Sequence, residues 1–191
     1  MEYLDQFVKK ILKIYPHHLR IFLQSSTFVV KQRRFNQGER IDGSYDIETG
    51  EIILWEPDLN DEEGLILIIT HELGHKIYHE WLERAEVEEW LIVRSLETID
   101  LGLMQSYSAI KRPEEEFCTL FSLASLAKYW DKNKMKAQSK KLTKKLKKTF
   151  PIATNTIEKC ISKNKHSKKS SHDITHREVQ HLKEWIHRVI D

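Results

Sequence analysis

The stretch His71-Glu72-Leu73-Gly74-His75 constrains this chain more than any other feature of its sequence. This H-E-x-x-H pattern follows an apolar run, Leu65 to Ile69, which favours a helix. On a helix, residues four apart lie on one face, so two imidazoles at this spacing can bind one metal ion. Glu72 could then reach a water on that ion. The pattern predicts zinc-assisted hydrolysis, usually of a peptide bond.

Length and composition limit the classes of protein to which the chain can belong. Its 191 residues can bury a real core, enough for one catalytic domain and an appendage. Its apolar runs are much shorter than a membrane span, and its acidic N-terminus lacks the order of a signal peptide. Cys118 and Cys160 form no C-x-x-C. These features predict a cytoplasmic protein with reduced thiols and no membrane contact.

Charge is distributed unevenly along the chain. Residues 128–169 hold 15 Lys, no Arg and two acids, a net charge of +13. Residues 170–191 carry a net charge of −1, which leaves −10 for residues 1–127 within the total of +2. An acidic front and a basic back indicate either two different roles or a contact of the chain with itself.

Hydrophobic periodicity predicts an α+β fold with a small mixed sheet. The predicted elements, in order, are an N-terminal helix at 3–15, a short helical piece at 19–23, a strand at 27–30, a hairpin at 43–55, a helix from about 61 to 81 that begins with an Asn60 cap and carries the H-E-x-x-H, and helices at about 85–101 and 113–130. The C-terminal part is therefore expected to be mostly helical.

Three segments are predicted from these patterns. Residues 1–130 form the catalytic domain. Residues 131–172 are a lysine-rich linker or partly helical segment, interrupted by Pro151. Residues 173–191 regain helical periodicity and form a C-terminal amphipathic helix.

A catalytic zinc site commonly has three protein ligands, so the H-E-x-x-H needs a partner. His79 lies four residues after His75, but three histidines on one straight helix cannot all converge on one metal. The acidic triplet Glu114-Glu115-Glu116 is the better source, since it opens a new helix 39 to 41 residues after His75. Acids are also favoured at that end of a helix by its dipole. Spacing alone leaves open which of the three glutamates is the ligand.

The H-E-x-x-H, followed by Pro113-Glu114-Glu115-Glu116-Phe117 and then Phe121, resembles the gluzincin metallopeptidases. The pattern is most similar to the small single-domain minigluzincins and to the lethal-factor-like protease domain. The resemblance covers residues 3–130. It implies a zincin-like fold and one catalytic Zn²⁺ held by His71, His75 and Glu115.

The resemblance also implies roles for residues outside the ligand set. A tyrosine before the ligand glutamate often hydrogen-bonds the tetrahedral intermediate, and Tyr107 lies one position away from the usual spacing. A strand before the active helix lines the cleft and pairs with extended substrate, for which Ile52 to Trp55 is the candidate. The second acid that the family often has one turn after the ligand is replaced here by Thr119, so its support must come from elsewhere.

Several functions fit these observations. The first is a zinc metalloendopeptidase acting on peptides or proteins, with Glu72 as general base and acid. The second is a regulatory metallopeptidase-like protein that acts on one specific partner. The third is a polyanion or nucleic-acid-binding protein with an inactive zinc site, which would use its lysine-rich segment. The C-terminal segment could also fold over the cleft, bring His172 or His176 to the metal, and inhibit the enzyme.

Overall fold

The computed structural model describes residues 2–36, 39–99 and 112–162. Within these ranges the helices are α1 (Glu2–Leu12), α2 (His17–Gln24), α3 (Glu62–Lys76), a π-helical turn η1 (Ile77–Trp81), α4 (Arg84–Leu96), α5 (Arg112–Lys132), α6 (Lys136–Thr149) and α7 (Pro151–Ser162). The strands are β1 (Thr27–Lys31), β2 (Arg34–Asn36), β3 (Glu39–Ile41), β4 (Gly43–Tyr45) and β5 (Glu51–Trp55). This is the predicted α+β class, with a mostly helical C-terminal part.

The main sheet has three strands in the order β1-β5-β4. β1 runs parallel to β5, whereas β4 runs antiparallel to it through the predicted hairpin, so the sheet is mixed. β2 and β3 form a separate antiparallel pair that the periodicity did not predict, because each has only three residues. The expectation that Ile52 to Trp55 pairs with substrate is wrong. Those residues belong to β5, which already has a neighbour on both sides, and the edge strands are β1 and β4.

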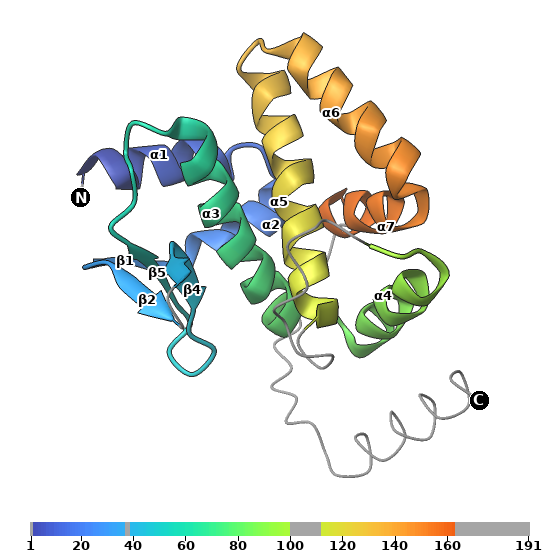
Figure 1. Ribbon diagram of the computed structural model, residues 1–191, viewed down its shortest axis with the longest axis horizontal. Coiled ribbons are helices and arrows are strands. Elements are labelled where there is room, and N and C mark those ends of the chain that lie inside the picture. Colours follow the sequence, from blue (N-terminus) through green and yellow to red (C-terminus); the bar gives the residue numbers. More distant parts are fainter. Residues whose placement is uncertain (1, 37–38, 100–111, 163–191) are drawn as a thin grey trace.

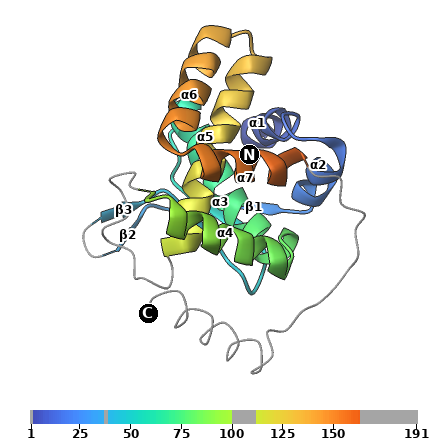
Figure 2. The same cartoon turned by 90° about the vertical axis from the view of Figure 1, so that its right-hand side faces the viewer.

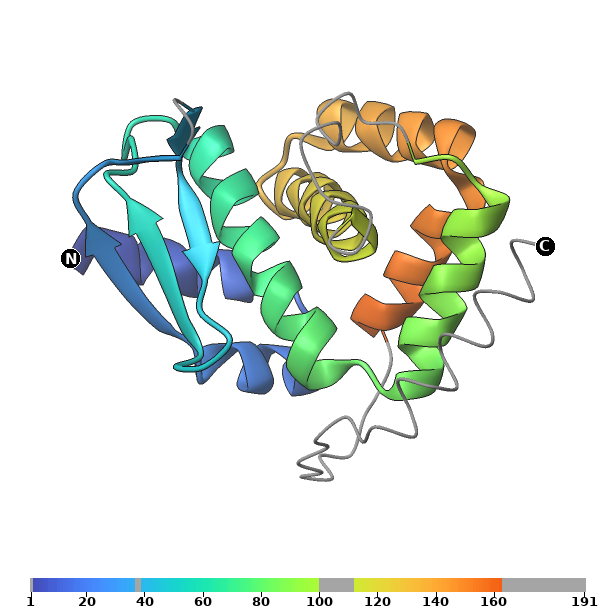
Figure 3. The same cartoon turned by 60° about the horizontal axis from the view of Figure 1, so that its bottom comes forward.

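α3 lies between the sheet and the C-terminal helices (Figures 1 and 3). Its N-cap is Asp61, whose carboxylate accepts a hydrogen bond of 2.9 Å from the Gly64 N–H, and not the predicted Asn60. Because α3 has neighbours on both sides, its buried residues include polar and charged side chains beside apolar ones: Leu65, Ile66, Ile69, Thr70, Glu72, Leu73, Gly74 and Lys76. A helix enclosed in this way holds the H-E-x-x-H rigidly.

α3 and α5 approach each other closely at Gly74. A Cβ atom on Gly74 would lie 3.0 Å from the Cα of Cys118 and 3.2 Å from its Sγ. The missing side chain therefore lets the two helix backbones approach next to His75. This crossing brings the first turn of α5, with its three glutamates, beside the histidines of α3.

The residues after 130 continue the same structure. α5 extends to Lys132, and α6 and α7 pack against it, while α7 also contacts α4 (Figures 1 and 2). Their buried residues belong to the core that includes the N-terminal helices: Leu146, Phe150, Ala153, Ile157 and Ile161. Pro151 is the first residue of α7, where it has no helical N–H to lose. The predicted linker thus contains two packed helices between residues 136 and 162, and the proposed boundary at 130 stays a prediction.

Candidate metal centre

His71, His75 and Glu115 converge at the crossing of α3 and α5. The Nε2 atoms of the two imidazoles are 3.2 Å apart. The Oε2 atom of Glu115 lies 3.2 Å from His71 Nε2 and 3.8 Å from His75 Nε2. All three side chains are mostly buried, with 23%, 12% and 12% of their surfaces exposed for His71, His75 and Glu115. Three potential ligand atoms thus point at one position.

These separations fit a metal ion. Ligand atoms at about 2.0–2.2 Å from a tetrahedral zinc lie about 3.3–3.6 Å from one another. Two imidazole nitrogens and one carboxylate oxygen are also a common donor set of catalytic zinc sites. The group can therefore hold a metal ion, with a coordination position left over. The structure brings together the three residues that the resemblance implied as ligands.

The three successive glutamates have three different sets of partners. Glu115 faces His71, while Glu116 is buried and accepts a hydrogen bond of 2.7 Å from Arg94 Nε and one of 3.3 Å from Arg94 Nη2. The Glu116 ion pair joins α5 to α4, away from the histidines. Glu114 contacts the other side of His75. Side chains on a helix diverge by about 100° from one residue to the next, so these divergent contacts follow from their helical positions.

Glu114 binds two histidines at hydrogen-bond distance. Its Oε1 lies 2.5 Å from His75 Nδ1 and 2.7 Å from His79 Nε2. Burial would raise the pKa of Glu114, but the hydrogen bonds from His75 and His79 outweigh it and lower the pKa to about 2. The carboxylate therefore stays ionised and accepts both hydrogen bonds. His75, His79 and Glu114 form a second group that could hold a metal ion by geometry.

His79 lies in η1, where the helix widens to π geometry directly after α3. It stays outside the group formed by His71, His75 and Glu115, as expected for a third histidine along one helix axis. The Tyr45 ring stacks against His79, with centroids 6.4 Å apart and planes inclined by 16°. The Tyr45 hydroxyl donates to Glu80, which also accepts from Lys76 Nζ at 2.9 and 2.8 Å. His79 is thus held between β4 and α5.

Glu72 points toward β4 and is 6% exposed. Burial raises the pKa of its carboxyl group, opposed by the charges of His71 and His75 and by a hydrogen bond from the Tyr45 backbone N–H. β4 approaches this carboxylate closely, because a Cβ atom on Gly43 would lie 2.7 Å from Glu72 Oε1 and 2.9 Å from Ile68 Cγ2. The carboxylate therefore lies against β4 and interacts electrostatically with His71, His75 and Glu115.

Gly43→Ala is expected to displace Glu72 without removing a metal ligand. The added methyl group cannot fit 2.7 Å from Oε1, so either the carboxylate or β4 must move. If Glu72 is the proton carrier, hydrolysis should fall by roughly tenfold or more, since small misplacements are costly in catalysis. Zinc affinity, measured by competition with a chromophoric chelator, should stay within about twofold of wild type. Unchanged hydrolysis by the folded variant would contradict this position for Glu72.

Some predicted residues lie outside the described part of the chain: Tyr107, His172, His176 and the segment 173–191. Conversely, the sequence did not single out Gly43, Tyr45 or the contacts of Glu114. Gly43 is the first residue of β4 and lies in the predicted hairpin at 43–55, but no motif marks it. The hairpin pattern therefore carried no signal for the closeness of Gly43 to Glu72.

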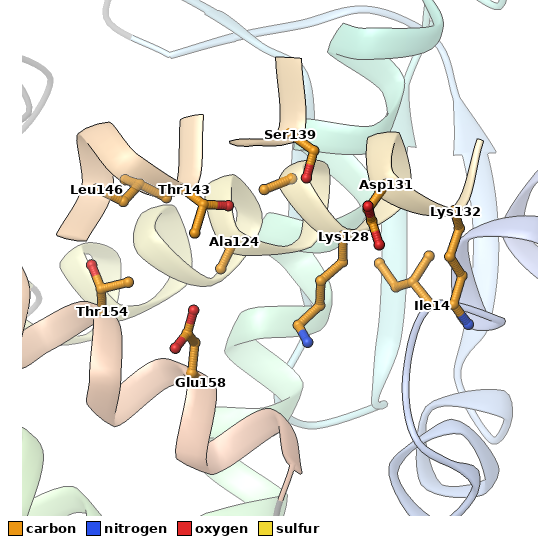
Figure 4. A pocket seen from close by; sticks show the side chains of 11 residues that line it. Ile14, Ala124, Lys128, Asp131, Lys132, Ser139, Thr143, Leu146, Thr154 and Glu158 are labelled. Carbon is orange, nitrogen blue, oxygen red and sulfur yellow. The ribbon is translucent and has the colours of Figure 1, made fainter. Parts of the chain in front are cut away.

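A separate cavity of about 260 Å³ lies between α5, α6 and α7 (Figure 4). Its lining combines apolar, hydroxyl and charged side chains: Ile14, Ala124, Ala127, Lys128, Asp131, Lys132, Ser139, Thr143, Leu146, Thr154 and Glu158. None of these residues belongs to the groups around His75. The cavity is thus structurally distinct from the candidate metal centre.

Comparison with known proteins adds no assignment. A scan against protein-family models and searches of curated proteins and of solved structures each returned no match. Within the described residues, no helix is long and apolar enough to cross a membrane.

Proposed function

We propose that this protein is a zinc-dependent metallopeptidase of the gluzincin type with a zincin-like fold. The observation that carries the proposal is the convergence of His71, His75 and Glu115 beside the buried carboxylate of Glu72. Two histidines from one helix, a glutamate from a later helix and an adjacent acid are the parts that zinc-assisted hydrolysis requires. The mixed sheet in front of α3 agrees with the same fold type.

The ligand residues would hold the ion, and Glu72 would move the proton. Zinc, when bound, supplies a Lewis acid that polarises a carbonyl group and lowers the pKa of water. Glu72 accepts a proton from the water as its oxygen bonds to the scissile carbonyl carbon. As the carbon–nitrogen bond breaks, Glu72 passes that proton to the leaving amine. Its burial keeps the carboxylate away from bulk water during this transfer.

The outer edge of β4 is the surface proposed to align substrate. Ser44 pairs with Ile53, and Trp55 donates to the Asp42 carbonyl, so residues 42 and 44 turn their backbone groups toward β5. Alternation in an antiparallel pair then turns the N–H and C=O groups of Gly43 and Tyr45 outward. The Tyr45 N–H donates to Glu72, so the Gly43 N–H and the two carbonyl groups are the ones proposed to pair with substrate. An extended peptide could add to this edge and place its carbonyl near Glu72. β4, and not β5, is therefore the strand proposed to pair with substrate.

The functional test is a digest of a peptide library by the purified protein. Cleavage that stops with a zinc chelator and returns with one equivalent of Zn²⁺ is the expected result. Cleavage of a single protein partner, with the library left intact, would favour the regulatory peptidase. A zinc-loaded protein that cleaves neither the library nor any protein of a proteome digest would contradict the proposed activity.

A further inference from the structure

The hydrogen bonds of Glu114 carry a further inference, which rests on the proposed zinc site. We propose that Glu114 is a positioning residue: it holds His75 in the tautomer and ring orientation that direct Nε2 to the metal. His79 is the second partner that fixes the Glu114 carboxylate in place.

Distances separate this role from that of a ligand. The contacts of Glu114 with His75 Nδ1 and His79 Nε2, 2.5 and 2.7 Å, are hydrogen-bond lengths. Atoms that share a tetrahedral zinc ion lie about 3.3–3.6 Å apart, as the His71 and His75 nitrogens nearly do. The two contacts of Glu114 are therefore hydrogen bonds, and Glu114 does not share a metal ion with these histidines.

The tautomer of His75 follows from the two ends of its ring. Nδ1 faces a carboxylate, so it carries the hydrogen and donates it. Nε2 then keeps its lone pair and faces His71 Nε2 and Glu115 Oε2. A carboxylate that accepts the distal N–H of a ligating histidine fixes the ring and makes it a stronger ligand. Glu114 is 22% exposed and His75 12%, so water competes little for this bond.

His79 forms a second hydrogen bond to Glu114, which restrains the carboxylate more than the hydrogen bond from His75 alone. It donates to the same oxygen, Oε1, and its own ring is held by stacking against Tyr45. The chain of contacts runs from β4 through His79 and Glu114 to His75. The order of the contacts predicts that the loss of His79 weakens the metal site less than the loss of Glu114.

The test measures the affinity of the full chain for Zn²⁺ by competition with a chromophoric chelator. Glu114→Ala should weaken zinc binding by about 10- to 100-fold. His79→Ala should weaken it by less, and Glu114→Asp should restore part of the loss. The absorption spectrum of the Co²⁺-loaded protein should change in Glu114→Ala, because the freed His75 ring alters the geometry of the ion.

Glu116→Gln is the control, because it also removes one negative charge from the acidic triplet. The partner of Glu116 is Arg94 and not a histidine. Glu116→Gln should lower the melting temperature while leaving zinc affinity within about twofold of wild type. Equal zinc affinity in wild type and folded Glu114→Ala would overturn the role of Glu114. A wild-type chain that binds no zinc would overturn the proposed metal centre itself, so the two failures are distinguishable.

A second and independent observation concerns the exposed face of α6. Its 14 residues include no acid and seven lysines, all exposed: Lys136, Lys140, Lys141, Lys144, Lys145, Lys147 and Lys148. Among the described residues, Lys147 forms an ion pair with Glu158. α6 and the end of α5 project from one end of the molecule (Figures 1 and 2). The lysines therefore form a positive ridge, defined here as these seven residues.

The side chains on the ridge indicate which class of partner it binds. Leu146 is buried and Leu142 packs against the core, so the exposed face has no large apolar side chain to insert into lipid. The ridge extends for about 18 Å along the helix, which spans several phosphates of a duplex. We infer that the ridge binds the phosphate backbone of a nucleic-acid duplex. Without Arg or aromatic side chains on the ridge, binding is independent of base sequence.

The test is fluorescence anisotropy of the full chain with a labelled 20-base-pair duplex over a salt series. Replacing Lys140, Lys144 and Lys148 by Gln should weaken binding at least tenfold and reduce the salt slope by about 2.7. The matched control replaces Lys9, Lys13 and Lys31, which removes the same charge elsewhere and should have a much smaller effect. Equal losses in the two triple variants, or binding to anionic vesicles without binding to duplex, would overturn the inference.

Discussion

Glu72→Gln is expected to abolish most peptide hydrolysis while leaving the metal centre loaded. Gln keeps the size and the hydrogen-bonding atoms of the side chain, but it cannot accept a proton from water at neutral pH. Loss of a general acid–base group lowers turnover by about 10²- to 10⁴-fold. Glu72 is not among the converging ligand atoms, so zinc stoichiometry should equal that of wild type. The measurements are hydrolysis rates on a fluorogenic peptide and zinc content after gel filtration.

The contacts of Glu72 indicate that Glu72→Gln should change the chemistry of the side chain without disturbing the local structure. Its carboxylate lies beside Gly43 and accepts a hydrogen bond from the Tyr45 backbone N–H. The amide oxygen of Gln can accept that same hydrogen bond, so the variant should fold with β4 in place. Full activity of a zinc-loaded Glu72→Gln protein would remove Glu72 from the mechanism. Loss of zinc together with activity would show instead that Glu72 supports the metal.

Glu115→Ala is expected to cause the largest loss of zinc affinity in the acidic triplet. It removes the oxygen that lies 3.2 Å from His71 Nε2 and 3.8 Å from His75 Nε2. Removing a ligand should cost more than the 10- to 100-fold typical of an outer partner. The measurement is zinc affinity by chelator competition, and activity should fall in parallel at limiting zinc.

Comparison within the triplet makes the Glu115 experiment decisive. The expected order of zinc affinity is wild type and Glu116→Gln highest, Glu114→Ala lower and Glu115→Ala lowest. The three glutamates are adjacent on one helix turn and carry the same charge. A nonspecific electrostatic effect would therefore lower the zinc affinity of all three variants by a similar factor. Equal zinc affinity in Glu114→Ala and Glu115→Ala would refute the choice of Glu115 as the ligand.

Spacing predicted which residues could meet, but it could not predict every contact. Helix geometry predicts that His71 and His75 share one face, and the usual ligand number of zinc sites predicts a third ligand. The structure brings Glu115 to these two histidines. The distribution of Glu114, Glu115 and Glu116 over three partners could not be predicted. It depends on the rotation of α5 about its axis, which the packing at Gly74 and the buried pair with Arg94 determine. Neither constraint is local in sequence.

The sheet shows the same division between local and distant interactions. The β4–β5 hairpin was predictable because a short turn joins its strands. The parallel pairing of β1 with β5 joins strands separated by 19 intervening residues, and strand periodicity contains no information on such partners. That pairing places β5 in the centre of the sheet and leaves β4 at the edge. The strand proposed to pair with substrate is therefore β4 and not β5.

The proposed metallopeptidase activity requires one zinc ion bound by two imidazoles and one carboxylate. X-ray absorption at the zinc edge, on the full chain loaded with one equivalent of Zn²⁺, tests this most directly. We predict nitrogen and oxygen scatterers at about 2.0–2.2 Å, including the pattern of two imidazole rings, and no sulfur. A sulfur scatterer at about 2.3 Å, which would indicate a cysteine ligand such as Cys118, or a chain that retains no zinc, would contradict the proposed metal centre.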